Sequence, residues 1–354
     1  MQPGDAKPGP RVSVLIPAYN VASFIEEAVR SAHGQIFRDV EVIVVDDGST
    51  DGTSEILRKL RDDIGSTPPP LIVMHQPNSG QNVTRNVGLE RARGEYVAFL
   101  DGDDRWHPEK LARHVAMLDA RPDLDLTFSW HRFIDEKGDE LGIGRRGPER
   151  ILSLADMVEH GHIASTSLLV GRLAAARAAG GFDPTLDSSA DLDFCLRVAM
   201  LRPNNIGCLP EVLVDYRRRH GQISSMTRRH PGDWERLLDK VRAFDPALVA
   251  RVEHRSRANK RLVLANIAYR SGNYAEARRF YRQALRISPS SMLLRPSHWR
   301  RGAQYYILPL LPLPLHARMV ALGRRLRARF RHRRGSDDDV GWPAPDRPGG
   351  GGRG

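Results

Sequence analysis

Short apolar runs alternate with segments of helical character over the first 130 residues, and this alternation restricts the fold more than any other feature of the sequence. Each run is five or six residues long and is followed by polar loop residues or by a helical pattern. Runs of this kind are typical of strands that are buried on both faces. Strands that alternate with helices form βαβ units and a mostly parallel sheet. The predicted strands are 12–16, 41–45, 71–75, 96–100 and 125–130.

The helices between these strands have recognisable starts. Ser23 and Glu26 have the S-x-x-E spacing of a capping box, which predicts a helix that continues to about His33. The loop sequence DDGSTDGTS is followed by a predicted helix that ends near Arg61. Further helices are predicted at 81–91 and 192–201, although the pattern from 150 to 225 is less regular. We therefore expect an α/β fold with a Rossmann-like, mostly parallel sheet and flanking helices.

The composition is that of a folded chain of about two domains. The chain has 354 residues, of which 40% are hydrophobic and 27% charged, and this excludes wholesale disorder. No apolar run approaches the ~20 residues of a membrane-spanning helix. The N-terminal MQPGDAKPGP has no apolar signal region, so a cytoplasmic location is expected. Only two cysteines occur, which excludes a disulfide framework and a cysteine-based zinc site.

The net charge of +11 is unevenly placed along the chain. Residues 295–334 contain 11 arginines and no acidic residue, the last 20 residues contribute −2, and the first 294 residues contribute +2. A nucleic-acid-binding domain would spread a basic face over its fold, so no nucleic-acid partner is expected for the main body. The basic stretch could still contact anionic lipid or RNA.

Two acidic clusters follow predicted strands directly. Asp46–Asp47 ends the second strand and Asp101–Asp104 follows the fourth. In such folds ligands bind at the carboxyl ends of the strands, and Mg²⁺ takes carboxylates together with substrate phosphate oxygens. The alternative is an ordinary Asp/Gly turn, because these residues also cap helices and fill loops. The sequence has neither the G-x-G-x-x-G fingerprint after a strand nor the phosphate-binding loop of P-loop ATPases.

Four separated motifs make the interpretation more specific. They are VSVLIPAYN at 12–20, VVDDGSTDGT at 44–53, the segment from NSGQN to PEKL at 78–111, and GGFDPTLDSSADLDFCLRV at 180–198. In this order they resemble the family 2 glycosyltransferases, and the resemblance covers residues 11–225. It implies the GT-A fold and inverting transfer of a sugar from a nucleotide-diphosphate sugar.

The resemblance also implies roles for residues at the strand ends. Asp47 would hydrogen-bond the nucleotide base, and the backbone of Pro17 and Ala18 would approach the nucleotide. In the D-x-D pair, Asp101 would face the ribose or the metal. Asp103 would hold a divalent metal, Mg²⁺ or Mn²⁺, on the diphosphate. The neighbouring Asp104 is expected to shape the loop.

Arg85 corresponds to the arginine of the family's R-N pair and could face nucleotide or phosphate, or could be a helix-surface arginine. His220, in YRRRHGQISS, is the candidate third metal ligand, and the alternative is a solvated histidine. The preceding arginines, 217–219, could neutralise diphosphate or lie on the surface.

Asp191 corresponds to the catalytic base of the family. The family motif is usually written E-D-x-D, whereas this chain reads Ala190-Asp191-Leu192-Asp193, so the first acid is missing. Asp191 would remove the proton of an acceptor hydroxyl, and Asp193 is expected to support the following helix. A glycan or lipid-linked acceptor in cell-envelope or exopolysaccharide synthesis is expected. The alternative function is a non-catalytic scaffold that acts through its helical tail.

The C-terminal third has a different character. Residues 262–289 have the spacing of one tetratricopeptide helix-turn-helix, and 233–261 also read as helical. Beyond them an apolar row and many arginines predict a basic amphipathic helix on an anionic membrane surface, with a packed surface helix as the alternative. The row is Leu315, Met319, Leu322, Leu326 and Phe330. The expected domains are a lead-in at 1–10, the GT-A domain at 11–225, the helical extension at 233–294, the basic segment at 295–334 and a disordered tail at 335–354.

Overall fold

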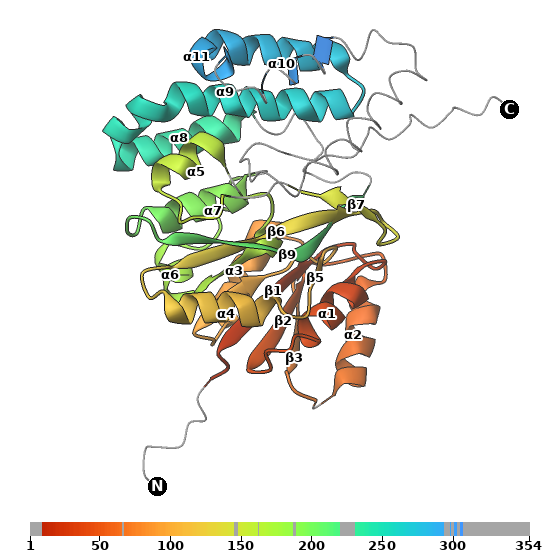
Figure 1. Ribbon diagram of the computed structural model, residues 1–354. Coiled ribbons are helices and arrows are strands. Elements are labelled where there is room, and N and C mark those ends of the chain that lie inside the picture. Colours follow the sequence, from red (N-terminus) through yellow and green to blue (C-terminus); the bar gives the residue numbers. More distant parts are fainter. Residues whose placement is uncertain are drawn as a thin grey trace, which may run out of the picture. The chain divides into compact units, whose positions relative to one another are not determined.

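The computed structural model describes residues 9–65, 67–144, 148–161, 163–186, 189–219 and 231–293, together with 298, 301–302 and 305–306. The chain forms two compact units, one of residues 1–157 with 161–220 and the other of 158–160 with 221–354. The first unit is an α/β sandwich and the second consists of helices (Figure 1).

The strands of the first unit confirm all five of the predicted ones and add four. They are β1 Val12–Ala18, β2 Val40–Asp46, β3 Leu71–His75, β4 Tyr96–Phe99, β5 Arg105–Trp106, β6 Leu126–Ile134, β7 Glu140–Ile143, β8 Leu169–Arg172 and β9 Ile206–Arg217. Every residue of β1 and β2 is buried, as expected for strands that are covered on both faces.

All nine strands belong to one sheet. Its order is β3-β2-β1-β4-β8-β6-β9-β5, with β7 on β6. The strands β3, β2, β1 and β4 are mutually parallel, whereas β8 is antiparallel to both of its neighbours, β4 and β6. Since β6 therefore runs in the direction of β4, the carboxyl ends of β1, β2, β4 and β6 all lie at one edge of the sheet.

The helices of the first unit cover the sheet on both faces (Figure 1). They are α1 Ile25–His33, α2 Thr53–Ile64, α3 Gln81–Arg91, α4 Lys110–Ala120, α5 Leu154–His160, α6 Leu173–Ala178 and α7 Ala190–Ala199, with the short 3₁₀ helix η1 Thr166–Leu168. The helix α3 packs against β1 and β2, and α4 packs against β6, β8 and β9.

The predicted capping box at Ser23 and Glu26 is wrong. The first residue of α1 is Ile25, so Phe24 occupies the cap position and makes no side-chain cap hydrogen bond. The Glu26 carboxylate instead accepts from Arg30 Nε one turn later, at 2.9 Å. A capping box does form at the start of α5, between Ser153 and Asp156.

The second unit contains α8 Pro231–Phe244, α9 Pro246–Arg270, α10 Tyr274–Ile287 and α11 Pro289–Leu293. The tetratricopeptide spacing is confirmed, because α9 and α10 form a helical pair about the turn at Gly272, whose φ is +75°. Small and aromatic side chains fill the centre of this pair. The buried members of the cluster are Ala265, Ala268, Tyr269, Ala277 and Tyr305.

No helix in the part of the chain that the structure describes is long and apolar enough to cross a membrane. The predicted basic amphipathic helix and the tail at 335–354 lie outside the described residues.

Candidate active site

The DDGSTDGT loop joins the carboxyl ends of β1 and β2 through side-chain hydrogen bonds. Asp46, at the end of β2, accepts from the backbone N–H of Ser49 at 3.2 Å, from the Ser49 hydroxyl at 2.6 Å, and from the Ser54 hydroxyl. Burial tends to raise the pKa of Asp46, but the donors from Ser49 and Ser54 outweigh it and lower that pKa. Asp51 binds the backbone N–H of Ala22, beyond β1, at 3.0 Å. These two carboxylates therefore hold the loop in shape.

Asp47, the expected contact of the nucleotide base, lies at the same edge and is 2% exposed. Its carboxylate accepts from the backbone N–H groups of Ser79 and Gly80, at 2.8 and 2.9 Å, and from Gln76 Nε2 at 2.8 Å. Gly80 is the residue before α3 and has a φ of +91°. Asp47 thus fixes where α3 begins.

Asp101 is bound by a buried arginine of helix α3. Arg85 is 5% exposed, and its Nη2 donates to Asp101 Oδ1 at 2.6 Å and to Thr166 Oγ1 at 3.1 Å. The Thr166 hydroxyl, on η1, also donates to Asp101 at 3.0 Å, and the guanidinium lies over the Phe182 ring. The alternative of a helix-surface arginine is therefore wrong.

Asp103 and Asp104 are held by residues at the end of β9 and just beyond it, and by η1. Arg219 Nε donates to Asp103 Oδ2 at 2.6 Å, and the backbone N–H of Arg217 donates to Asp104 Oδ1 at 2.9 Å. The Ser167 hydroxyl donates to the other oxygen of Asp104 at 2.6 Å. Burial and the nearby Asp103 and Asp101 charges raise the pKa of Asp104 well above its usual range. The loop-shaping role expected for Asp104 agrees with these contacts.

Arg217 is a residue whose importance the sequence did not reveal. It is fully buried, and its Nε donates to the backbone oxygen of Asp103 at 2.9 Å while its Nη1 donates to the oxygens of Asp135 and Glu136. Its Nη2 pairs with Glu27 on α1. Arg217 thus connects α1, the D-x-D turn and the loop after β6.

Gly102, between the two acids of the D-x-D pair, lies against β1. A Cβ atom there would lie 3.1 Å from the backbone oxygen of Pro17 and 3.2 Å from Val21 Cγ2. The absence of a side chain lets the turn approach the end of β1, where Pro17 and Ala18 are both buried.

The expected catalytic base, Asp191, lies half-buried in the first turn of α7. Aromatic contacts place this helix at the end of β4: the Phe194 ring lies 5.6 Å from that of Phe99 and stacks on Phe182 at 4.6 Å. The residues before α7 are held to α3, since Asn82 Nδ2 donates to the oxygen of Leu186 at 2.8 Å. Ala190, which replaces the family's first acid, is buried.

Asp193 is buried and forms an ion pair with Arg197, with 2.7 Å between Oδ2 and Nη2. The guanidinium of Arg197 also donates to the backbone oxygen of Gly181 at 2.6 Å. Asp193 therefore supports α7, as expected, and is not directed at a substrate.

The donor atoms near the D-x-D turn fit a hard divalent cation that is completed by substrate oxygens. Among the described residues no group of three or more His, Cys, Asp or Glu side chains is arranged to hold a metal ion. Mg²⁺ commonly binds through one or two carboxylates plus substrate phosphates, which matches a pair such as Asp101 and Asp103. Arg219 shares Asp103 Oδ2, so a cation on that oxygen would displace this arginine. His220 lies outside the described residues.

The comparisons with known proteins agree with this geometry. Residues 13–172 match the model of "Glycosyl transferase family 2". This part of the chain is thus similar to the family 2 glycosyltransferases. A second match, to a tetratricopeptide repeat, covers residues 262–291. Asp191 and the arginines at 217–219 lie beyond the matched part of the glycosyltransferase domain.

Two curated relatives are similar to parts of the chain. A protein named as a teichuronic acid biosynthesis glycosyltransferase, TuaG of Bacillus subtilis, is 36% identical over 46% of this chain and 63% of its own length. The uncharacterized glycosyltransferase RT0329 of Rickettsia typhi is 28% identical over 64% of this chain and 70% of its own length. A further relative, alr2836 of Nostoc, is matched over only 33% of its length. The chain thus spans less than two thirds of TuaG and of alr2836.

A solved structure is similar in fold over both units. The structure of residues 1–349 of S. aureus TarS in complex with UDP-GlcNAc aligns with a TM-score of 0.59 at 23% identity and covers 83% of this chain and 88% of its own. At this identity the likeness shows the GT-A-like fold and not the substrate.

Proposed function

We propose that this chain transfers a sugar, with inversion, from a nucleotide-diphosphate sugar to a hydroxyl group of a cell-envelope glycan or of its lipid-linked precursor. The observation that carries the proposal is that one helix, α3, joins two acids at the carboxyl edge of β2 and β4. Asp47 fixes the start of α3, and Arg85 from the same helix binds Asp101. The names of TuaG and of the TarS complex support an envelope glycan and a nucleotide-sugar donor.

The donor would lie along the ends of β1, β2 and β4. Pro17, Ala18 and Asp47 would contact the nucleotide, and Asp101 would face the ribose. Arg85 donates through Nη2 to both Asp101 and Thr166, so it would act by fixing the Asp101 carboxylate. This assigns Arg85 as a positioning residue.

Asp103, with Asp101, would hold Mg²⁺ or Mn²⁺ on the diphosphate. When bound, such an ion stabilises the charge that develops on the leaving nucleoside diphosphate. The ion pair between Arg219 and Asp103 gives this chain a second positive group at the same carboxylate. Once displaced by the ion, the Arg219 guanidinium would be available to the diphosphate.

Asp191 would accept the proton of the acceptor hydroxyl as its oxygen attacks the anomeric carbon from the face opposite the leaving group. The first turn of a helix favours the ionised form of a carboxylate through the helix dipole, and a general base must be ionised. Because the acceptor oxygen itself attacks, no enzyme nucleophile is required.

The test is to incubate the full chain with a panel of nucleotide-sugars and Mn²⁺ or Mg²⁺ and to measure release of nucleoside diphosphate with and without glycan acceptors. The proposal expects release from one donor class that an acceptor accelerates. If no donor in the panel is either bound or consumed, the proposed function is wrong.

The second candidate is a non-catalytic protein of the same fold that acts through its helical unit. The observation that favours it is Ala190, a buried alanine at the position of the family's first acid. Tight nucleotide-sugar binding without turnover for any donor and acceptor would favour this alternative.

A further inference from the structure

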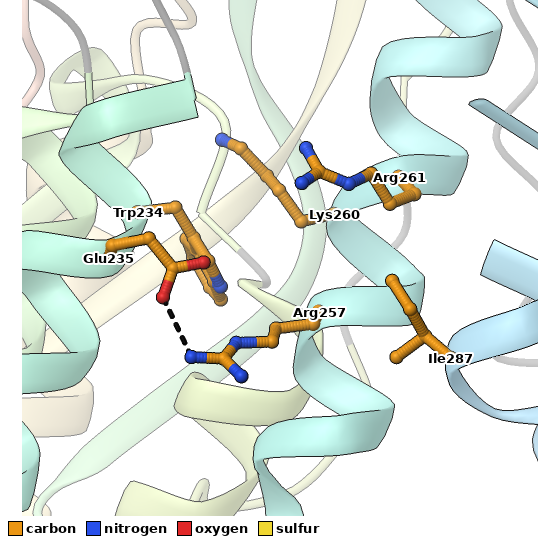
Figure 2. A pocket seen from close by; sticks show the side chains of 6 residues that line it. All are labelled: Trp234, Glu235, Arg257, Lys260, Arg261 and Ile287. Atoms are coloured by element: carbon orange, nitrogen blue, oxygen red, sulfur yellow. Dashed lines mark hydrogen bonds and ion pairs between the residues drawn. The ribbon is translucent and has the colours of Figure 1, made fainter. Parts of the chain in front are cut away.

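The helical unit contains a small pocket of its own. Its volume is about 30 Å³, enough for about two water molecules or two oxygens of a bound ion. Figure 2 shows side chains from three helices around it. They are Trp234 and Glu235 of α8, Arg257, Lys260 and Arg261 of α9, and Ile287 of α10.

Two buried nitrogen donors in this pocket have no acceptor among the residues that the structure describes. Trp234 is 6% exposed, and its indole Nε1 makes no hydrogen bond. Arg257 Nε is also buried without a partner, although Nη2 of the same guanidinium donates to Glu235 Oε2 at 2.9 Å. Buried N–H groups are nearly always paired in proteins, and a ligand oxygen would satisfy both.

The charge of the pocket indicates the sign of that ligand. Three cationic side chains line it, against one carboxylate, which Arg257 already neutralises. The Lys260 ammonium lies 5.2 Å from the centre of the Trp234 ring, so Lys260 extends toward the indole (Figure 2). Arg261 adds a second cation from the neighbouring position of α9. Indole and guanidinium N–H donors beside a net positive charge are the groups that bind an oxyanion.

The sequence around the pocket also carries a net positive charge. Residues 231–293 contain 13 Lys or Arg and 6 Asp or Glu, which is a net charge of +7. Residues 1–230, in contrast, contain 28 Lys or Arg and 33 Asp or Glu, which is a net charge of −5. The positive charge is therefore not confined to 295–334, because the near-neutral total of the first 294 residues conceals two opposite contributions. Such a field concentrates anions near the helical unit.

We propose that this pocket binds an oxyanion, a phosphate or a carboxylate, that is carried by the acceptor glycan. That the oxyanion belongs to the acceptor glycan rests on the proposed function, but the presence of an oxyanion site does not. The pocket would hold one charged group of an anionic acceptor on the helical unit while a hydroxyl of that acceptor reacts elsewhere.

The site is tested by following the indole N–H signal of Trp234 in the ¹⁵N-labelled full chain, identified by its loss in Trp234→Phe. The signal should shift saturably with inorganic phosphate or with glucuronate, and not with NaCl at equal ionic strength. The probe that binds more tightly shows whether the pocket prefers phosphate or carboxylate. Identical shifts in NaCl, or no saturable shift with either probe, would overturn the site.

Charge variants provide the matched comparison. Lys260→Gln together with Arg261→Gln should weaken binding of the better probe at least ~10-fold, since each charge-assisted contact contributes strongly. A double control with the same change in charge, Arg251→Gln with Arg279→Gln, alters exposed residues that do not line the pocket and should have no such effect. Equal weakening in both pairs would mean a diffuse field and no site.

The role in transfer is tested separately. The pocket variant should raise KM for an anionic acceptor several-fold and leave KM for a neutral acceptor and donor hydrolysis unchanged. Unchanged KM for both acceptors would overturn the acceptor assignment. If phosphate or glucuronate binds but no sugar is transferred, the site stands and the proposed function fails. Saturable binding of phosphatidylglycerol vesicles through the same residues, with no effect of a soluble glycan, would overturn the glycan as carrier.

Discussion

Asp191 and Asp193 are two carboxylates in the first turn of α7 with different surroundings. Asp193 is buried against Arg197, whereas Asp191 is half-buried. We expect Asp191→Asn to lower kcat by about 10²–10⁴, the contribution of a general base, and to leave donor affinity nearly unchanged. Steady-state turnover assays measure kcat, and donor titrations measure the affinity for the donor.

Asp193→Asn is the matched comparison. It removes one partner of a buried ion pair and should lower the free energy of unfolding by about 3 kcal/mol, which denaturant titration would detect. If Asp191→Asn retained the wild-type rate, the base would have to be reassigned.

Asp103 is the residue on which metal dependence rests. Asp103→Ala should abolish turnover, and a chelator should do the same reversibly to the wild-type protein, because the leaving diphosphate loses its stabilising charge. Diphosphate release before and after addition of Mn²⁺ or Mg²⁺ is the measurement. Full activity in excess chelator would contradict metal dependence.

His131 makes folding stability depend on pH. It is 1% exposed in β6, and neither ring nitrogen has a hydrogen-bond partner within the described part of the chain. Burial, with a smaller effect of Arg218, lowers its pKa to about 3. The unfolded chain has an ordinary histidine pKa near 6.5, so between about pH 6.5 and 3 the unfolded state binds the extra proton. The free energy of unfolding should therefore fall as the pH falls through this range, by up to about 1.4 kcal/mol per pH unit.

His131→Phe keeps the ring contacts with Phe133 and Tyr216 and should remove this part of the acid sensitivity. Denaturant titrations of both proteins from pH 7 to pH 4 measure the difference. The exposed His254→Phe serves as control. Parallel stability curves for wild type and His131→Phe would contradict the argument.

At the scale of elements, the sequence predicted the strands that are continuous apolar runs and missed those that are short or irregular. The missed strand β5 has two residues, and the register of β9 against β6 shifts twice near Pro210, which disturbs the alternation of its side chains. The unpredicted helix α4 buries Lys110 and His114, so its core-facing side is not apolar in sequence.

The candidate site, like the strands, was predicted only where a local sequence pattern marks it. The acids that follow apolar strands were found, because their position requires only local pattern. The burial of Arg217 was not found, since three consecutive arginines indicated either a diphosphate contact or a surface position. Its partners come from α1, from the D-x-D turn and from the loop after β6, and no local pattern contains such contacts.

Arg217 gives a prediction at this scale, because it joins several elements. Arg217→Met should lower the free energy of unfolding by about 3 kcal/mol, the effect of breaking a buried ion pair. It should also speed amide hydrogen exchange at 101–104. Arg58→Met removes an exposed ion pair with Glu55 and should leave the free energy of unfolding nearly unchanged. If both variants changed the free energy of unfolding equally, the contacts of Arg217 would not be important for stability.

At the scale of the whole chain, the charge of the C-terminal region leads to the membrane prediction. The apolar row between Leu315 and Phe330, flanked by arginines, should bind anionic vesicles, with each basic residue near the surface contributing ~1 kcal/mol. Added salt should weaken the binding. Co-sedimentation of the full chain and of a truncation after Tyr306 with anionic and neutral vesicles is the measurement.

The truncation point keeps Tyr305, which is buried in the cluster of α9 and α10. Equal partitioning of the two proteins, or none by either, would remove the reason to place the enzyme at a membrane.

The position of Arg217 also has a consequence for how the protein is made. The backbone N–H of Arg217 binds Asp104, 113 residues earlier in the chain, and β9 is the last strand to join the sheet. During synthesis on the ribosome the D-x-D turn therefore emerges long before the residue that anchors it. Contacts so distant in sequence form late in folding, because a long loop must close first. A nascent chain that ends before β9 would already carry Asp47, Asp101 and Asp103, but it would lack Arg217 and Arg219, which hold the D-x-D turn.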